Sequence, residues 1–172
     1  MTVLGVRGVR SRSREVAFAV ARMGHHLTGL VATSEVLSSF AREHGLRTPT
    51  PLEQGLALLP LCDDDLDAIA SGPHTDGTCG FVHLSGQLAE VLRRASSAGT
   101  IVYFETDYAG GAGRQAAVAY GHGSVAVPPS VGTRGPINGA LRAVGARVLE
   151  PASDEFEAVG LHRHRRRDVE DE

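Results

Sequence analysis

The sequence contains no lysine, so all 17 basic residues are arginines. This absence excludes two kinds of enzyme, because a P-loop requires a lysine beside the nucleotide phosphates and Schiff-base chemistry requires a lysine amine. The formal net charge is −3. The chain therefore also lacks the basic surplus that is typical of nucleic-acid-binding domains, and we expect no nucleic-acid partner.

Cysteines and long apolar runs are scarce as well. Cys62 and Cys79 are the only two cysteines, and their spacing fits neither a zinc motif nor a redox motif. We therefore expect two reduced thiols. No apolar run approaches the ~20 residues of a membrane span, and residues 1–7 are too poor in apolar side chains for a signal peptide. These features predict a cytoplasmic protein that makes no contact with a membrane.

A chain of 172 residues has the length of about one domain. We expect residues 1–161 to form a single α+β domain and residues 162–172 to form a charged, mobile C-terminal tail. The basic cluster 162–167 in this tail is followed at once by the acidic run 168–172. The basic and acidic residues cancel in charge, which predicts that they screen one another within the tail. The alternative is that the basic cluster contacts an acidic surface.

Helical periodicity and capping residues recur along the chain. Residues 2–7 suit an opening strand, and helical material is predicted from there to Gly45, with an interruption at Gly24 and the His25–His26 pair. The predicted helices are residues 16–23, a helix started by Thr33 or Ser34, a brief acidic helix capped by Asp63, a helix capped by Ser85, a helix started by Pro136 and a short turn capped by Ser153.

The strand signals are concentrated in the middle of the chain. Residues 55–61 form a short continuous apolar run, and residues 81–84 suit either a strand or the lead-in to the next helix. Residues 100–107 are rich in β-branched and aromatic side chains, and residues 115–120 are their expected hairpin partner. The pattern predicts an α+β fold with a mainly antiparallel sheet around this central hairpin and helices packed largely on one face.

The hairpin also carries the most suggestive side chains. Because side chains alternate along a strand, Tyr103, Glu105 and Asp107 are expected on one side. Two neighbouring carboxylates can form an acid/base pair. They can equally pair with Arg114 across the hairpin, in which case the segment is structural or contacts a partner.

Two other signals are too weak to predict a cofactor or a metal site. Gly111, Gly113 and Ala116 match the spacing of a dinucleotide-binding motif, but that motif must start a helix, and an apolar strand follows here. The glycines suit a tight or bulged hairpin instead. The eight histidines show no ligand spacing that specifies zinc. We therefore expect no cofactor and no metal.

The C-terminal half resembles small bacterial proteins similar to the immunity proteins of contact-dependent inhibition. The residues that carry the resemblance are Tyr103–Phe–Glu–Thr–Asp107–Tyr108, Gly110–Gly111–x–Gly113–x–Gln115, Gly135–Pro136–Ile137–Asn138–x–Ala140–Leu141, Asp154–Glu155–Phe156 and Gly160–Leu161–x–Arg163–His164. The resemblance implies a cytoplasmic protein that binds one cognate toxin and blocks it by occupying a surface. It implies no catalytic residue.

The sequence thus predicts stoichiometric protein binding, with Glu105, Asp107, Tyr108 and Arg114 as the partner-binding residues. These residues flank a Gly-rich loop on a hairpin, which is a common place for recognition residues. Two alternatives remain open: a small enzyme that uses Glu105 and Asp107 as its acid/base pair, and a structural or regulatory interaction domain. The oligomeric state cannot be predicted from these features.

Overall fold

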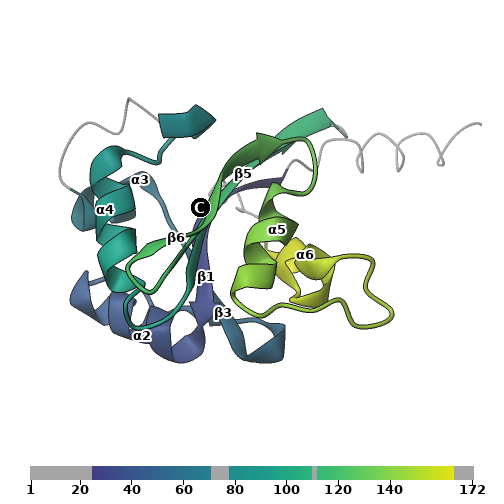
Figure 1. Cartoon of the computed structure of the whole chain (residues 1–172), viewed down its shortest axis with the longest axis horizontal. Coiled ribbons are helices and arrows are strands. Elements are labelled where there is room, and N and C mark those ends of the chain that lie inside the picture. Colours follow the sequence, from purple (N-terminus) through teal and green to yellow (C-terminus); the bar gives the residue numbers. More distant parts are fainter. Residues whose placement is uncertain (1–24, 71–77, 110–111, 165–172) are drawn as a thin grey trace, which may run out of the picture.

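The computed structural model describes residues 25–70, 78–109 and 112–164. The predicted strand at residues 2–7, the predicted helix at 16–23 and the end of the tail lie outside the described residues. Figure 1 shows a sheet that crosses the middle of the molecule, with helices on either side of it.

The sheet has six strands in the order β2-β3-β1-β4-β5-β6, and every neighbouring pair is antiparallel. This arrangement confirms the predicted α+β fold and the central hairpin, which is β4 with β5. The strands are β1 (His25–Thr33), β2 (Thr50–Pro51), β3 (Leu56–Pro60), β4 (Ile101–Ala109), β5 (Ala112–Gly121) and β6 (Ser124–Gly132).

Strand β1 lies in the centre of the sheet, between β3 and β4, and its position corrects the prediction of helical material up to Gly45. Its apolar run is short, and such a run cannot be assigned to helix or strand by periodicity alone. Gly29 allows β1 and β3 to lie close together, because a Cβ at this position would lie 2.9 Å from the carbonyl oxygen of Leu59 on β3.

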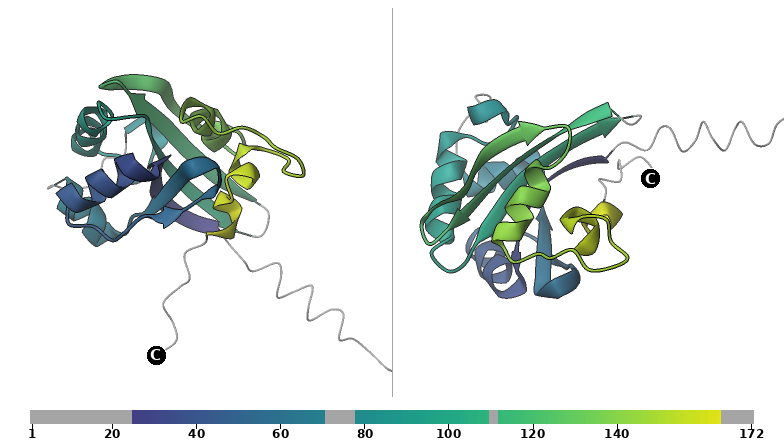
Figure 2. Two further views of the ribbon diagram at one scale, coloured as in Figure 1. Left: turned by 90° about the horizontal axis from the view of Figure 1, so that it is seen from below. Right: turned by 45° about the vertical axis from the view of Figure 1, so that its right-hand side comes forward.

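Helices cover both faces of the sheet (Figures 1 and 2). The helices α2 (Ser34–Glu43), α3 (Asp63–Ile69) and α4 (Gly86–Ala95) pack on one face, whereas α5 (Pro136–Ala143) and α6 (Glu155–Ala158) pack on the other. The second face therefore carries more helix than the sequence prediction gave it. The cause is visible in β4, because its side chains on both faces are buried from Ile101 to Phe104.

The helix starts agree with the predicted caps in most cases. Thr33 Oγ1 accepts a hydrogen bond from Val36 N at 3.5 Å, and Ser85 Oγ accepts one from Leu88 N at 3.1 Å. Two caps were predicted one residue off. Cys62 rather than Asp63 precedes α3, and Asp154 rather than Ser153 caps α6, because the Asp154 carboxylate accepts from Glu157 N at 2.9 Å.

Three short 3₁₀ turns complete the described chain: η1 (Glu53–Gly55), η2 (Thr78–Gly80) and η3 (Leu161–Arg163). Residues 81–84 form no strand and lead into α4. The turn η3 packs Leu161 into the core. Among the described residues, no helix is long and apolar enough to cross a membrane.

Both cysteines are free thiols in the structure, as the sequence predicts. Cys79 is exposed in η2, whereas Cys62 is half-buried at the start of α3. We therefore expect two thiols per chain in a titration under denaturing, non-reducing conditions. In the native protein, Cys79 should react with the reagent faster than Cys62. Fewer than two thiols in the denatured titration would contradict the assignment.

Candidate functional site

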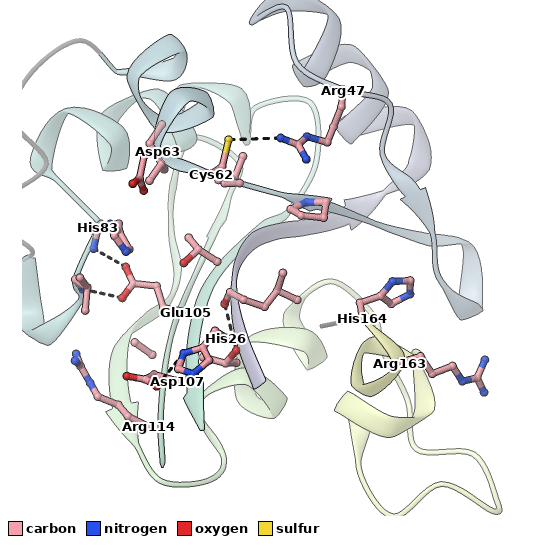
Figure 3. Close-up of a pocket in the computed structure, with 18 residues that line it drawn as sticks. His26, Arg47, Cys62, Asp63, His83, Glu105, Asp107, Arg114, Arg163 and His164 are labelled. Carbon is pink, nitrogen blue, oxygen red and sulfur yellow. Dashed lines mark hydrogen bonds and ion pairs between the residues drawn. The ribbon is translucent and has the colours of Figure 1, made fainter. Parts of the chain in front are cut away.

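A pocket of about 900 Å³ lies at one end of the sheet, and we call it the sheet-end pocket. It is bordered by the first residues of β1, the last part of β4, the first part of β5, the start of α3 and the segment at residues 82–83 (Figure 3). Three of the four predicted partner-binding residues, Glu105, Asp107 and Arg114, line it.

Cross-strand register brings the polar side chains of this pocket together in rows. Asp107 on β4 lies opposite His26 on β1 and Arg114 on β5. In the next row, Glu105 lies between Thr28 and Ala116, whose small side chains leave space beside it. The third row, with Tyr103 at its centre, belongs to the buried core. The same face of the sheet thus changes from apolar to polar within three rows.

Glu105 forms part of the fold. The residue is 7% exposed, and its carboxylate accepts hydrogen bonds from Val82 N at 2.7 Å, from His83 N at 2.8 Å and from the Tyr103 hydroxyl at 2.8 Å. Burial, together with the nearby Glu105 carboxylate, raises the pKa of Tyr103 well above its usual value, so this phenol stays protonated and donates. The carboxylate ties the 82–83 segment to the sheet and shapes one wall of the pocket.

Asp107 has a different environment, although it shares the face of Glu105. Its side chain is 72% exposed, and its Oδ1 lies 3.0 Å from Nδ1 of His26. The two carboxylates therefore contact separate partners.

Arg114 is half-buried and lies opposite Asp107 in the register. Among the residues that the structure describes, no carboxylate forms an ion pair with its guanidinium, so the pairing with Glu105 or Asp107 that the sequence left open is not formed. The guanidinium lies beside η2 instead, where a Cβ on Gly80 would be 3.7 Å from Nη2. A half-buried guanidinium with unused donors can bind a carboxylate or another anion.

Tyr108 faces the opposite side of the sheet, because side chains alternate along β4. It lines a second pocket of about 490 Å³, and its hydroxyl donates to the carbonyl of Thr133. Gly113 lies opposite Tyr108 in the register, and a Cβ on Gly113 would lie 2.3 Å from the Tyr108 ring. The four predicted residues thus divide between two pockets, one on each face of the hairpin end. The residues that line the second pocket are Tyr108, Gln115, Arg134, Gly135, Asn138, Asp154, Phe156 and His162.

Several residues of the sheet-end pocket were not predicted. Arg47 donates to the Asp65 carboxylate at 2.8 Å, and its guanidinium also lies 3.5 Å from the Cys62 sulfur. The Cys62 N–H donates to the same carboxylate at 2.9 Å. This contact fixes the start of α3 at the border of the pocket. His26 could be predicted as a pocket residue only if β1 were assigned as a strand, because the strand register places it opposite Asp107. The sequence prediction placed His26 in a break between two helices instead.

Among the residues described, no group of three or more histidine, cysteine, aspartate or glutamate side chains could hold a metal ion. The pocket can bind an anionic group through Arg114, and its walls are fixed by hydrogen bonds. Comparison with protein-family models, with curated proteins and with solved structures gives no match for this chain.

Proposed function

We propose that this protein acts in the cytoplasm by stoichiometric binding of a protein partner, and that the partner is a toxin which this binding neutralises. The single observation that carries the proposal is the half-buried Arg114 guanidinium, which lines a preformed pocket without a carboxylate partner among the described residues. The resemblance to immunity proteins gives the class of partner. Binding to the protein encoded by the adjacent gene tests this class of partner.

The environment of Glu105 favours binding over the enzymatic alternative. A general base must reach a proton of its substrate, whereas the Glu105 carboxylate is occupied by two backbone N–H groups and the Tyr103 hydroxyl. Asp107 is exposed and paired with His26. A rigid, polar and partly open surface on a central hairpin is suited to docking a partner without chemistry.

The test is a charge reversal at Arg114, measured by calorimetric titration against the protein encoded by the adjacent gene. We expect Arg114→Glu to weaken the complex by about tenfold or more, because it replaces an anion-binding group with a repulsive one. The matched control is Arg147→Glu, since Arg147 is exposed on the loop after α5 and lines neither pocket. Thermal melting of both variants shows whether the fold is intact.

Two results would contradict the proposal. Equal affinity of Arg114→Glu and the unchanged protein would remove Arg114 from the binding surface. Turnover of a small substrate that is lost in a folded Asp107→Asn variant would favour the enzymatic alternative.

A further inference from the structure

The sheet has an internal edge that opens into the sheet-end pocket. Strand β1 pairs with β4 from His25 onward, but it pairs with β3 only from Gly29 onward. Beyond Pro60 the chain leaves the sheet and enters α3 at Asp63. The first part of β1 therefore has a neighbouring strand on one side only. His26, Leu27 and Thr28 in this part all line the pocket.

The direction of the backbone groups at this edge follows from one hydrogen bond. Leu61 N donates to the Thr28 carbonyl at 2.9 Å, so Thr28 directs its backbone groups toward the β3 side. Because successive residues of a strand direct these groups to alternate sides, His26 also directs its N–H and C=O to the β3 side, whereas Leu27 and Gly29 direct theirs to β4.

In the described chain, no backbone partner is present for the N–H and C=O of His26 on this side, nor for the N–H of Thr28. These groups form a short row of strand donors and acceptors at the border of a pocket. An unpaired row of this kind is a template for an added strand.

The two outer edges of the sheet are poor templates by comparison. Strand β2 has only two residues, and one of them is Pro51. Strand β6 carries Pro128 and Pro129 in its middle, where neither can donate a ladder hydrogen bond. Natural sheets use short strands and prolines in this way to prevent unwanted pairing. The edge at His26 has no such protection.

An arginine without a carboxylate partner lies beside this edge and favours an acidic side chain in an added strand. Three arginines, Arg47, Arg114 and Arg163, line the pocket, and Arg114 has no carboxylate partner among the residues described. Arg47 and Arg163 each contact one carboxylate and keep further N–H donors. Of the three carboxylates in the lining, Glu105 is bonded to its three donors, Asp107 contacts His26, and Asp63 is exposed at the start of α3. Figure 3 shows Arg47 and Arg114 on different sides of the pocket.

We propose that the partner binds by adding an extended segment with acidic side chains to the free edge of β1 at His26 and Thr28. This inference rests on the proposed function, because it specifies how the partner enters the same pocket. The segment pairs with the N–H and C=O of His26 and with the N–H of Thr28, and one of its carboxylates meets Arg114.

Amide hydrogen exchange tests the proposal residue by residue in the unchanged full-length protein. The His26 and Thr28 amides should exchange fast in the free protein, and the Leu27 and Gly29 amides, which face β4, should exchange slowly. The protein encoded by the adjacent gene should slow exchange at His26 and Thr28 by about tenfold or more and leave Leu27 and Gly29 unchanged. The peptide acetyl-Val-Glu-Val-Glu-Val-Glu-amide should give the same pattern, whereas its lysine counterpart should not.

A matched pair of variants separates the backbone from the side chain. His26→Pro removes the N–H that faces the pocket, and His26→Ala removes the same imidazole but keeps the N–H. We expect His26→Pro to bind the partner at least about tenfold more weakly than His26→Ala does. Equal affinity of the two variants would overturn the proposal.

The remaining outcomes distinguish this inference from the function on which it rests. If the adjacent-gene protein binds without slowing His26 and Thr28, the edge proposal is wrong and the binding function stands. If only the glutamate peptide protects the edge, the edge proposal stands and the assignment of that partner fails. Equal protection by the lysine peptide overturns the acidic character, and protection by none of the probes overturns the whole inference.

Discussion

Replacing Glu105 with alanine is expected to lower the free energy of unfolding by about 3–5 kcal/mol. The substitution removes an acceptor for Val82 N, His83 N and the Tyr103 hydroxyl in a place where the Glu105 residue is only 7% exposed. Each buried donor left without a partner costs about 1–3 kcal/mol, and part of this cost is recovered where water reaches the 82–83 segment. Urea denaturation followed by circular dichroism measures the loss.

Two control variants define the cause of this loss. Glu105→Gln keeps one acceptor oxygen and should cost less than Glu105→Ala. Asp107→Ala removes an exposed carboxylate with a single imidazole contact, and it should stay within about ±0.5 kcal/mol of the unchanged protein. If Glu105→Ala is as mild as Asp107→Ala, Glu105 does not hold the 82–83 segment, and the enzymatic reading of this carboxylate would regain support.

The contrast between these two carboxylates shows what could be predicted from sequence. Strand alternation correctly places Glu105 and Asp107 on one face of β4. It cannot say which of them is buried, because the donors for Glu105 come from residues 82 and 83, outside the hairpin. Alternation also implies that Tyr108 faces the opposite side of the sheet. The sequence prediction nevertheless grouped Tyr108 with Asp107, because the two residues are neighbours in sequence.

The fold was predictable wherever local signals agree with one another. The cap at Ser85, the proline at the start of α5 and the β-branched run of β4 each favour a single structure, and each forms as expected. Strand β1 was not predictable in this way, because its central place depends on partners from residues 56–60 and 102–108. Because β1 was not predicted, neither the position of His26 in the pocket nor the free edge of the sheet could be predicted.

The hairpin end depends on close packing between its two strands as much as on charge. Gly113 pairs with Tyr108, and the nearest contacts of an added Cβ would be the Tyr108 ring at 2.3 Å and the Asp107 carbonyl oxygen at 2.5 Å. The ring can rotate away only by giving up its hydrogen bond to Thr133, and the carbonyl belongs to the ladder itself. A methyl group therefore cannot be accommodated without moving β4 away from β5.

Gly113→Ala is accordingly expected to destabilise the protein by about 3 kcal/mol, at the upper end of the usual cost of overpacking. The measurement is the free energy of unfolding in urea, beside the matched control Gly139→Ala. Gly139 lies inside α5 with no atom close to an added Cβ, so alanine there should stabilise the helix by about 0.5–1 kcal/mol.

A double variant shows whether the ring or the carbonyl is decisive. If the Tyr108 ring is the main obstacle, Tyr108→Ala combined with Gly113→Ala will cost less than the sum of the two single changes, with a coupling of about 1 kcal/mol or more. Additive costs would assign the strain to the Asp107 carbonyl and thus to the ladder. A Gly113→Ala protein as stable as the unchanged one would contradict the close approach of the two strands, and with it the rigid hairpin end on which both pockets depend.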